Sequence, residues 1–86
     1  MKLYIYHCLD NERVPEDMTH AIIGDCVTII KGRAFYNHTR LVSVMSDSVK
    51  KFERFAFYGC RALRFIRLSK TLEFIGFQVF YHCESL

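Results

Sequence analysis

The chain contains no tryptophan, one proline and four glycines in 86 residues, and none of its four cysteines forms a CxxC pair. So few glycines and prolines exclude a flexible linker or a low-complexity tail. The cysteine spacing provides no zinc-finger or redox motif, so free and largely buried thiols are the default interpretation. No apolar run approaches the ~20 residues that a membrane-spanning helix needs. These absences leave a small globular domain.

Charge and catalytic signatures are also scarce. The net charge is only +3, which does not indicate nucleic-acid binding by itself, because phosphate contacts need cations clustered on one face. The HExxH, GxSxG, GxxxxGK[ST] and GxGxxG motifs are all missing. Four histidines occur without metal-ligand spacing: His7, His20, His38 and His82. The sequence therefore predicts a non-enzymatic protein that holds no metal and no cofactor.

The first ten residues differ from a secretory signal. They contain a single lysine and an apolar run interrupted by His7 and Cys8, with no small-residue cleavage site. Together with the missing transmembrane segment, this favours a cytoplasmic location.

Apolar and aromatic residues are plentiful. Hydrophobic residues make up 51% of the chain and aromatic residues 15%, all of them phenylalanine or tyrosine. Such a composition is typical of a folded domain rather than a disordered segment. We expect the rings to fill a shared core.

Three segments of the chain align with one another: residues 27–41, 49–63 and 72–86. Each begins with an aliphatic residue, has an apolar residue three positions later, and then carries a small residue followed by phenylalanine and tyrosine. A leucine closes each segment. The offset is 22 residues between the first two and 23 between the last two. The matched positions are Val27, Val49 and Leu72; Ile30, Phe52 and Ile75; Ala34, Ala56 and Val79; Phe35, Phe57 and Phe80; Tyr36, Tyr58 and Tyr81; and Leu41, Leu63 and Leu86. A repeat of this period predicts stacked coils that share one core.

Short strands are expected between these segments. The clearest reads Leu63-x-x-Ile66-x-Leu68, and alternation places its apolar residues towards the core and Arg64 and Arg67 towards solvent. The equivalent stretch after Leu41 is one residue shorter, so its register near residues 45–47 is open. Upstream, Met18-x-x-Ala21-x-Ile23 forms a degenerate third copy. The strands are predicted to pair in a parallel sheet.

The triplets of small residue, phenylalanine and tyrosine are expected to open short helical turns. The small residue allows neighbouring coils to approach, and the phenylalanine enters the shared core. We therefore predict that Phe35, Phe57 and Phe80 stack as a ladder.

The pattern V-x-x-I-x-x-x-A-F-x-x-C-x-x-L-x-x-I-x-L resembles the leucine-rich repeats of the BspA type, over about residues 18–86. The lead-in, residues 14–20, resembles the segment that precedes such repeats in proteins of single-celled algae. His38, Ser69 and Val79 depart from the usual cysteine, proline and alanine. The resemblance implies an α/β leucine-rich repeat solenoid of about two and a half repeats of 22–23 residues. It offers no catalytic residues and implies adhesion, recognition or scaffold roles.

The best candidate for a binding face is Arg64 and Arg67, at outward strand positions, with Arg61 and Lys70 nearby. They would suit an acidic protein surface, and the alternative is solvated charge without a ligand. Nucleic acid is not favoured, because no stacking motif accompanies the cations.

Two other repeated positions have alternative interpretations. Cys60 and Cys83 form either a disulfide or a metal site with His38 or His82, or they fill the interior as small apolar groups, which is favoured. The tyrosines of the three triplets form either an aromatic binding strip or, as is favoured, a cap over the core.

The two ends are expected to differ. Residues 1–17 contain a possible edge strand around Tyr4 and a turn at residues 10–12, and they would cover the first coil of the stack in residues 18–86. No polar capping coil follows Leu86, so the chain is expected to be a fragment of a longer array or to self-associate through its open C-terminal end. The predicted function is protein–protein interaction, and the alternative is a structural spacer without a ligand.

Overall fold

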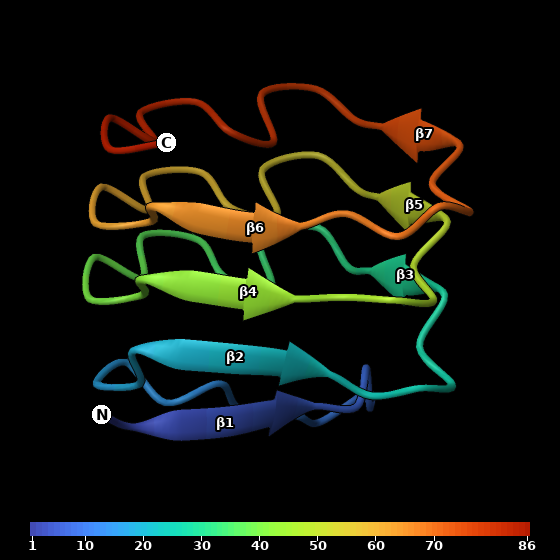
Figure 1. Cartoon of the computed structure of the whole chain (residues 1–86), viewed down its shortest axis with the longest axis horizontal. Helices are drawn as coiled ribbons and strands as arrows, with labels where there is room; N and C mark the ends of the chain where they lie inside the picture. The colour runs from blue at the N-terminus through green and yellow to red at the C-terminus, as the bar shows by residue number, and fades with distance from the viewer.

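The computed structural model describes all 86 residues as short parallel strands joined by turns (Figure 1). Seven strands follow one another along the chain: β1 (Leu3–Tyr6), β2 (His20–Ile23), β3 (Ile29–Ile30), β4 (Ser43–Met45), β5 (Lys51–Phe52), β6 (Phe65–Arg67) and β7 (Phe74–Ile75). They form a four-stranded sheet in the order β1-β2-β4-β6 and a three-stranded sheet in the order β3-β5-β7. Successive repeats contribute strands to the two sheets in turn, and they stack from the blue N-terminus to the red C-terminus in Figure 1.

The predicted strands of the four-stranded sheet are present and parallel. Ala21, Val44 and Ile66 share one row, which fixes the register that the shorter link after Leu41 left open. The inward position of Leu68 was predicted wrongly, because this side chain is 46% exposed. It follows β6, the edge strand of the sheet, so no further strand covers it. Ser69 is buried instead and donates a hydrogen bond to the carbonyl of Val49.

The three-stranded sheet is a feature that the sequence did not reveal. Each of its strands has two residues, which is too short to show an alternating pattern. The apolar positions Ile30, Phe52 and Ile75 lie in one row, and the first two are fully buried. The sheet therefore closes the core on the side opposite the longer strands of each repeat.

The expected helical turns are absent, so the α/β class was wrong in its helical part. In these turns six residues have a positive φ that a right-handed helix does not allow: Arg33, Phe55 and Gln78 before the small residue, and Asn37, Gly59 and His82 after the tyrosine. The turn backbone bonds to the next repeat instead, because the N–H of Phe35 donates to the carbonyl of Ala56 at 2.8 Å and the N–H of Phe57 donates to that of Val79 at 3.1 Å. The triplets thus form stacked turns.

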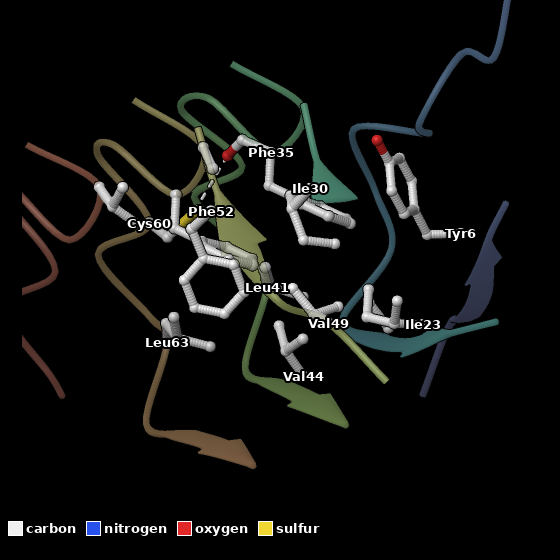
Figure 2. Packing of buried hydrophobic residues seen from close by; sticks show 14 of the residues in the cluster. Tyr6, Ile23, Ile30, Phe35, Leu41, Val44, Val49, Phe52, Cys60 and Leu63 are labelled. Carbon is white, nitrogen blue, oxygen red and sulfur yellow. Dashed lines mark hydrogen bonds between the residues drawn. The ribbon is translucent and has the colours of Figure 1, made fainter. Parts of the chain in front are cut away.

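The core runs through the stack between the two sheets and the turns (Figure 2). Phe35 and Phe57 stack with ring centroids 5.1 Å apart and planes 5° apart, and Phe57 and Phe80 stack at 5.7 Å and 4°. The predicted phenylalanine ladder is therefore confirmed. Leu41 and Leu63, which close two of the repeats, are fully buried beneath it.

The N-terminal segment joins the stack through β1, which pairs in parallel with β2. β1 lies at the edge of the four-stranded sheet, so the predicted edge strand is confirmed. Tyr6 is buried with its ring centroid 5.3 Å from that of Phe35. The following loop is organised by Glu12. Its carboxylate accepts hydrogen bonds from the N–H groups of His7 and Leu9, each at 2.9 Å, and from the hydroxyl of Tyr4.

This carboxylate links the stability of the N-terminal segment to pH. Burial opposes ionisation of Glu12, but the hydrogen bonds from Tyr4, His7 and Leu9 outweigh it and lower the pKa of Glu12. A depressed pKa in the folded state stabilises the fold above the ordinary carboxyl pKa, and this contribution is lost as the pH falls through the folded value.

We expect Glu12→Gln to lower the free energy of unfolding on the order of 1 kcal/mol at neutral pH, since the carboxylate is only partly buried and solvent screens its interactions. Urea unfolding at neutral and acidic pH measures the change. The difference between the two proteins should shrink in acid. A difference that does not change with pH would contradict the role given to the ionised carboxylate.

Candidate interaction surface

The outward face of the four-stranded sheet carries two rows of side chains that cross all of its strands. Strand register places Leu3, His20, Ser43 and Phe65 in one row, and Ile5, Ile22, Met45 and Arg67 in the other. Alternation along each strand turns these residues away from the core. Ile5, Ile22 and Met45 are 46%, 40% and 37% exposed. We call these three residues the apolar strip.

Phe65 widens the apolar strip on the neighbouring row, where it is half exposed. Parallel sheets usually have both faces covered by other elements. Here no element packs over the outward face of the four-stranded sheet, as Figure 1 shows. The apolar side chains on it are therefore available to another molecule.

Both predicted binding residues, Arg64 and Arg67, are exposed. Arg67 continues the row of the apolar strip on β6, whereas Arg64 lies outside this strand. The Nε of Arg67 forms an ion pair with Oδ1 of Asp47 at 3.0 Å. Both groups are more than half exposed, so the pair adds little to stability. Arg64 stands directly before β6, and its backbone N–H donates to the carbonyl of Val42 at 2.9 Å. Its guanidinium forms no ion pair.

Sequence reasoning missed the apolar strip, although a signal for it was present. Ile5 and Ile22 directly precede the buried Tyr6 and Ile23, so strict alternation turns them outward once the latter are assigned to the core. The arginines were noticed because charge is conspicuous at an outward position. Outward isoleucines are recognised only when the register of several strands is known.

Cys60 and Cys83, in the turns, fill space in and beside the core, as the favoured interpretation predicted. All four cysteines of the chain are free. The thiol of Cys60 donates to the carbonyl of Phe35 at 3.0 Å, and that of Cys83 to the carbonyl of Phe57 at 3.2 Å. Burial raises the pKa of Cys60 to about 12, and burial also raises the pKa of Cys83. Both thiols are therefore neutral at physiological pH and link one repeat to the preceding one.

His38 stands at the corresponding place of the first repeat. Its ring nitrogens lie 3.2 Å from the carbonyl oxygen of Tyr36 and 3.4 Å from that of Val14. The side chain thus connects the first turn to the N-terminal segment, where the other repeats have a thiol bonded to a neighbouring turn.

The tyrosines of the triplets form a second ladder beside the phenylalanines. Tyr36 and Tyr58 stack at 4.9 Å and 7°, and Tyr58 and Tyr81 at 5.5 Å and 30°. The guanidinium of Arg33 lies 5.6 Å from the ring centroid of Tyr36 and 5.4 Å from that of Phe55. The turns therefore have a partly exposed aromatic edge that lies outside the buried core cluster.

No three histidine, cysteine, aspartate or glutamate side chains come together in a way that would hold a metal ion. The structure contains no helix with the length and apolar character needed to cross a bilayer.

Residues 15–86 match the family model described as BspA type Leucine rich repeat region (6 copies). The match covers most of the chain and includes both sheets from β2 onwards. No curated protein and no solved structure is matched.

Proposed function

Because the chain belongs to the BspA-type leucine-rich repeat family, we propose that it is a non-catalytic module that presents a surface to another protein. The family match supports the general role in protein interaction. The exposed apolar strip is the observation that supports the specific surface. Repeat stacks commonly bind partners along such continuous faces.

The chemistry of this face suits a protein partner. Its centre is apolar, formed by Ile5, Ile22 and Met45, and its edge is polar, with Arg64 and the ion pair of Arg67. An apolar centre within a charged rim is typical of protein–protein interfaces. The partner would offer apolar side chains to the strip and carboxylates to the two arginines.

We also propose a division of the chain into two parts. Residues 18–86 form the leucine-rich repeat solenoid, and residues 1–17 cover its first coil. The cover is supported by the pairing of β1 with β2 and by reciprocal hydrogen bonds of 2.8 Å between Lys2 and Thr19. It also extends the apolar strip, because Ile5 belongs to β1.

A binding experiment with matched variants tests the surface. Affinity purification followed by mass spectrometry would identify a partner of the wild-type chain, and its affinity would then be measured for each variant. Ile22→Glu is expected to weaken binding by at least about tenfold, since it places a charge at the centre of the interface. Arg64→Glu and Arg67→Glu are expected to have smaller effects at the rim.

Thr39→Glu is the control, because it adds the same charge at an exposed position in a turn. Circular dichroism would check that each variant is folded. Equal affinity of Ile22→Glu and Thr39→Glu for the partner would rule out the apolar strip as the binding site and would favour a spacer role.

The last repeat supports a second association. Ile75, Tyr81 and Leu86 are each about half exposed, and the edges of β6 and β7 are unpaired. Exposed apolar strand edges are prone to pair with another chain. We propose that this end self-associates. Sedimentation velocity should show species that grow with concentration, and a monomer at all concentrations would contradict the proposal.

A further inference from the structure

A hollow of about 460 Å³ lies beside the three-stranded sheet, away from the apolar strip. It spans three successive repeats and is lined by Gly32, Lys51, Glu53, Arg54, Phe74, Gly76 and Phe77. Its volume falls within the range of ligand-binding pockets.

The hollow carries positive charge that no ion pair neutralises. Lys51 and Arg54 belong to none of the three ion pairs of the chain, in contrast to Lys2, Lys31 and Arg67. The ammonium of Lys51 lies 5.5 Å from the ring centroid of Phe74, which holds it over the edge of the hollow. An adjoining hollow of about 390 Å³, lined by Gly32, Arg33 and Arg54, adds a third cation.

Glu53 is the only acidic residue of the lining, and its carboxylate is engaged by the backbone. Its Oε1 accepts a hydrogen bond from the N–H of Gly32 at 3.0 Å, which joins two repeats. This bond holds Oε1 at the peptide group of Gly32, and Glu53 forms no ion pair with Lys51 or Arg54. The guanidinium of Arg54 therefore remains available to an anion from outside.

The same hollow has an apolar wall. Phe74 is 54% exposed and Phe77 is 66% exposed. Large aromatic side chains contribute much to stability and binding when they are buried, so exposure of two neighbouring phenylalanines is unusual. Phe77 packs edge-to-face against Phe55 at 5.9 Å, so its ring is held in place. A ligand that covers both rings would gain from burial as well as from charge.

We propose that this hollow binds an acidic peptide segment of another protein, in which carboxylates flank an aromatic or aliphatic side chain. The carboxylates would pair with Lys51 and Arg54, and the apolar side chain would cover Phe74 and Phe77. A nucleic-acid strand needs a groove that follows several phosphates, whereas these cations gather around one hollow. The site is separate from the apolar strip and does not depend on its function.

Fluorescence anisotropy with the folded 86-residue chain tests the site. The probe is a short fluorescein-labelled peptide in which glutamates flank one phenylalanine, and its counterpart carries glutamines in place of the glutamates. The double variant Lys51→Gln/Arg54→Gln is expected to weaken binding of the glutamate peptide by about tenfold or more. Phe77→Ala should weaken it as well, and higher salt should reduce the affinity.

The double variant Arg61→Gln/Lys70→Gln is the matched control, because it removes the same charge from exposed positions outside the hollow. Ile22→Glu should leave peptide binding unchanged, so failure at the hollow is distinguishable from failure at the apolar strip. Equal weakening by both double variants, equal binding of the glutamine peptide, or tighter binding of a labelled oligothymidylate would each overturn the proposal.

Discussion

Replacement of Phe57 by alanine is expected to lower the free energy of unfolding by about 3–5 kcal/mol, the range found when a buried aromatic ring is removed. Phe57 is fully buried and stacks on Phe35 and Phe80, and Phe52 packs edge-to-face on it at 5.5 Å. Its removal would leave a cavity in the middle of the ladder. Because the backbone of each turn is bonded to its neighbours, the cavity has little freedom to collapse.

Urea or thermal unfolding followed by circular dichroism measures this loss. Phe65→Ala is the matched control, since it removes the same ring from a position that is 52% exposed. Its expected effect is below about 1 kcal/mol, as is usual for surface substitutions. Similar losses in the two variants would show that the phenylalanine ladder is not the centre of the fold. A small domain has only about 5–15 kcal/mol of stability, so Phe57→Ala should be partly unfolded on warming.

The ladder was predictable because every repeat has its phenylalanine at the same number of residues from the other matched positions. Stacking is the consequence of a regular period, and it needs no knowledge of the local backbone. The turn conformation was not predictable in this way. It depends on pairs of residues with a positive φ, such as Arg33 and Asn37. Arginine and phenylalanine rarely adopt this conformation, so their presence in the sequence does not predict it.

The candidate surface was predicted only in part, for a related reason. Arg64 and Arg67 are both exposed, but only Arg67 has the predicted outward position on the strand, because β6 begins at Phe65. The ion pair of Arg67 with Asp47 depends on how two repeats stack. The apolar strip depends on the register of β1, β2 and β4, which the sequence left open near Met45. The hollow combines residues from three repeats, and each of them is unremarkable in its own repeat.

The two glycines of the hollow also differ in what they allow, and this difference predicts the second large effect. A Cβ on Gly76 would lie 2.8 Å from the backbone nitrogen of Arg54, 3.0 Å from the carbonyl oxygen of Phe52 and 3.1 Å from the carbonyl carbon of Glu53. All three atoms belong to the backbone of the preceding repeat, so none of them can rotate away. Gly76→Ala must therefore push the last repeat off its neighbour, and it must strain the 2.8 Å hydrogen bond from the N–H of Gly76 to the carbonyl of Phe52.

We expect Gly76→Ala to lower the free energy of unfolding by about 1–3 kcal/mol, the usual cost of an overpacked contact. The φ of Gly76 is not in the left-handed region, so backbone strain does not contribute. Gly32→Ala is the control, because its Cβ would meet the carbonyl oxygen of Arg54 at 3.3 Å and the next atom at 3.9 Å. It should change stability by less than about 1 kcal/mol, since the entropy lost by the unfolded chain opposes the tight contact.

Hydrogen exchange separates a local effect of Gly76→Ala from a global one. The last repeat has only one neighbour, so loss of protection should be confined to the amides that join it to the preceding repeat, among them those of Glu73, Phe74 and Gly76. Protection in β2 and β4 should persist, because their contacts lie in earlier repeats. Uniform loss of protection along the chain would instead mean that the repeats unfold as one unit. In that case the close approach at Gly76 would stabilise the whole stack rather than its last repeat alone.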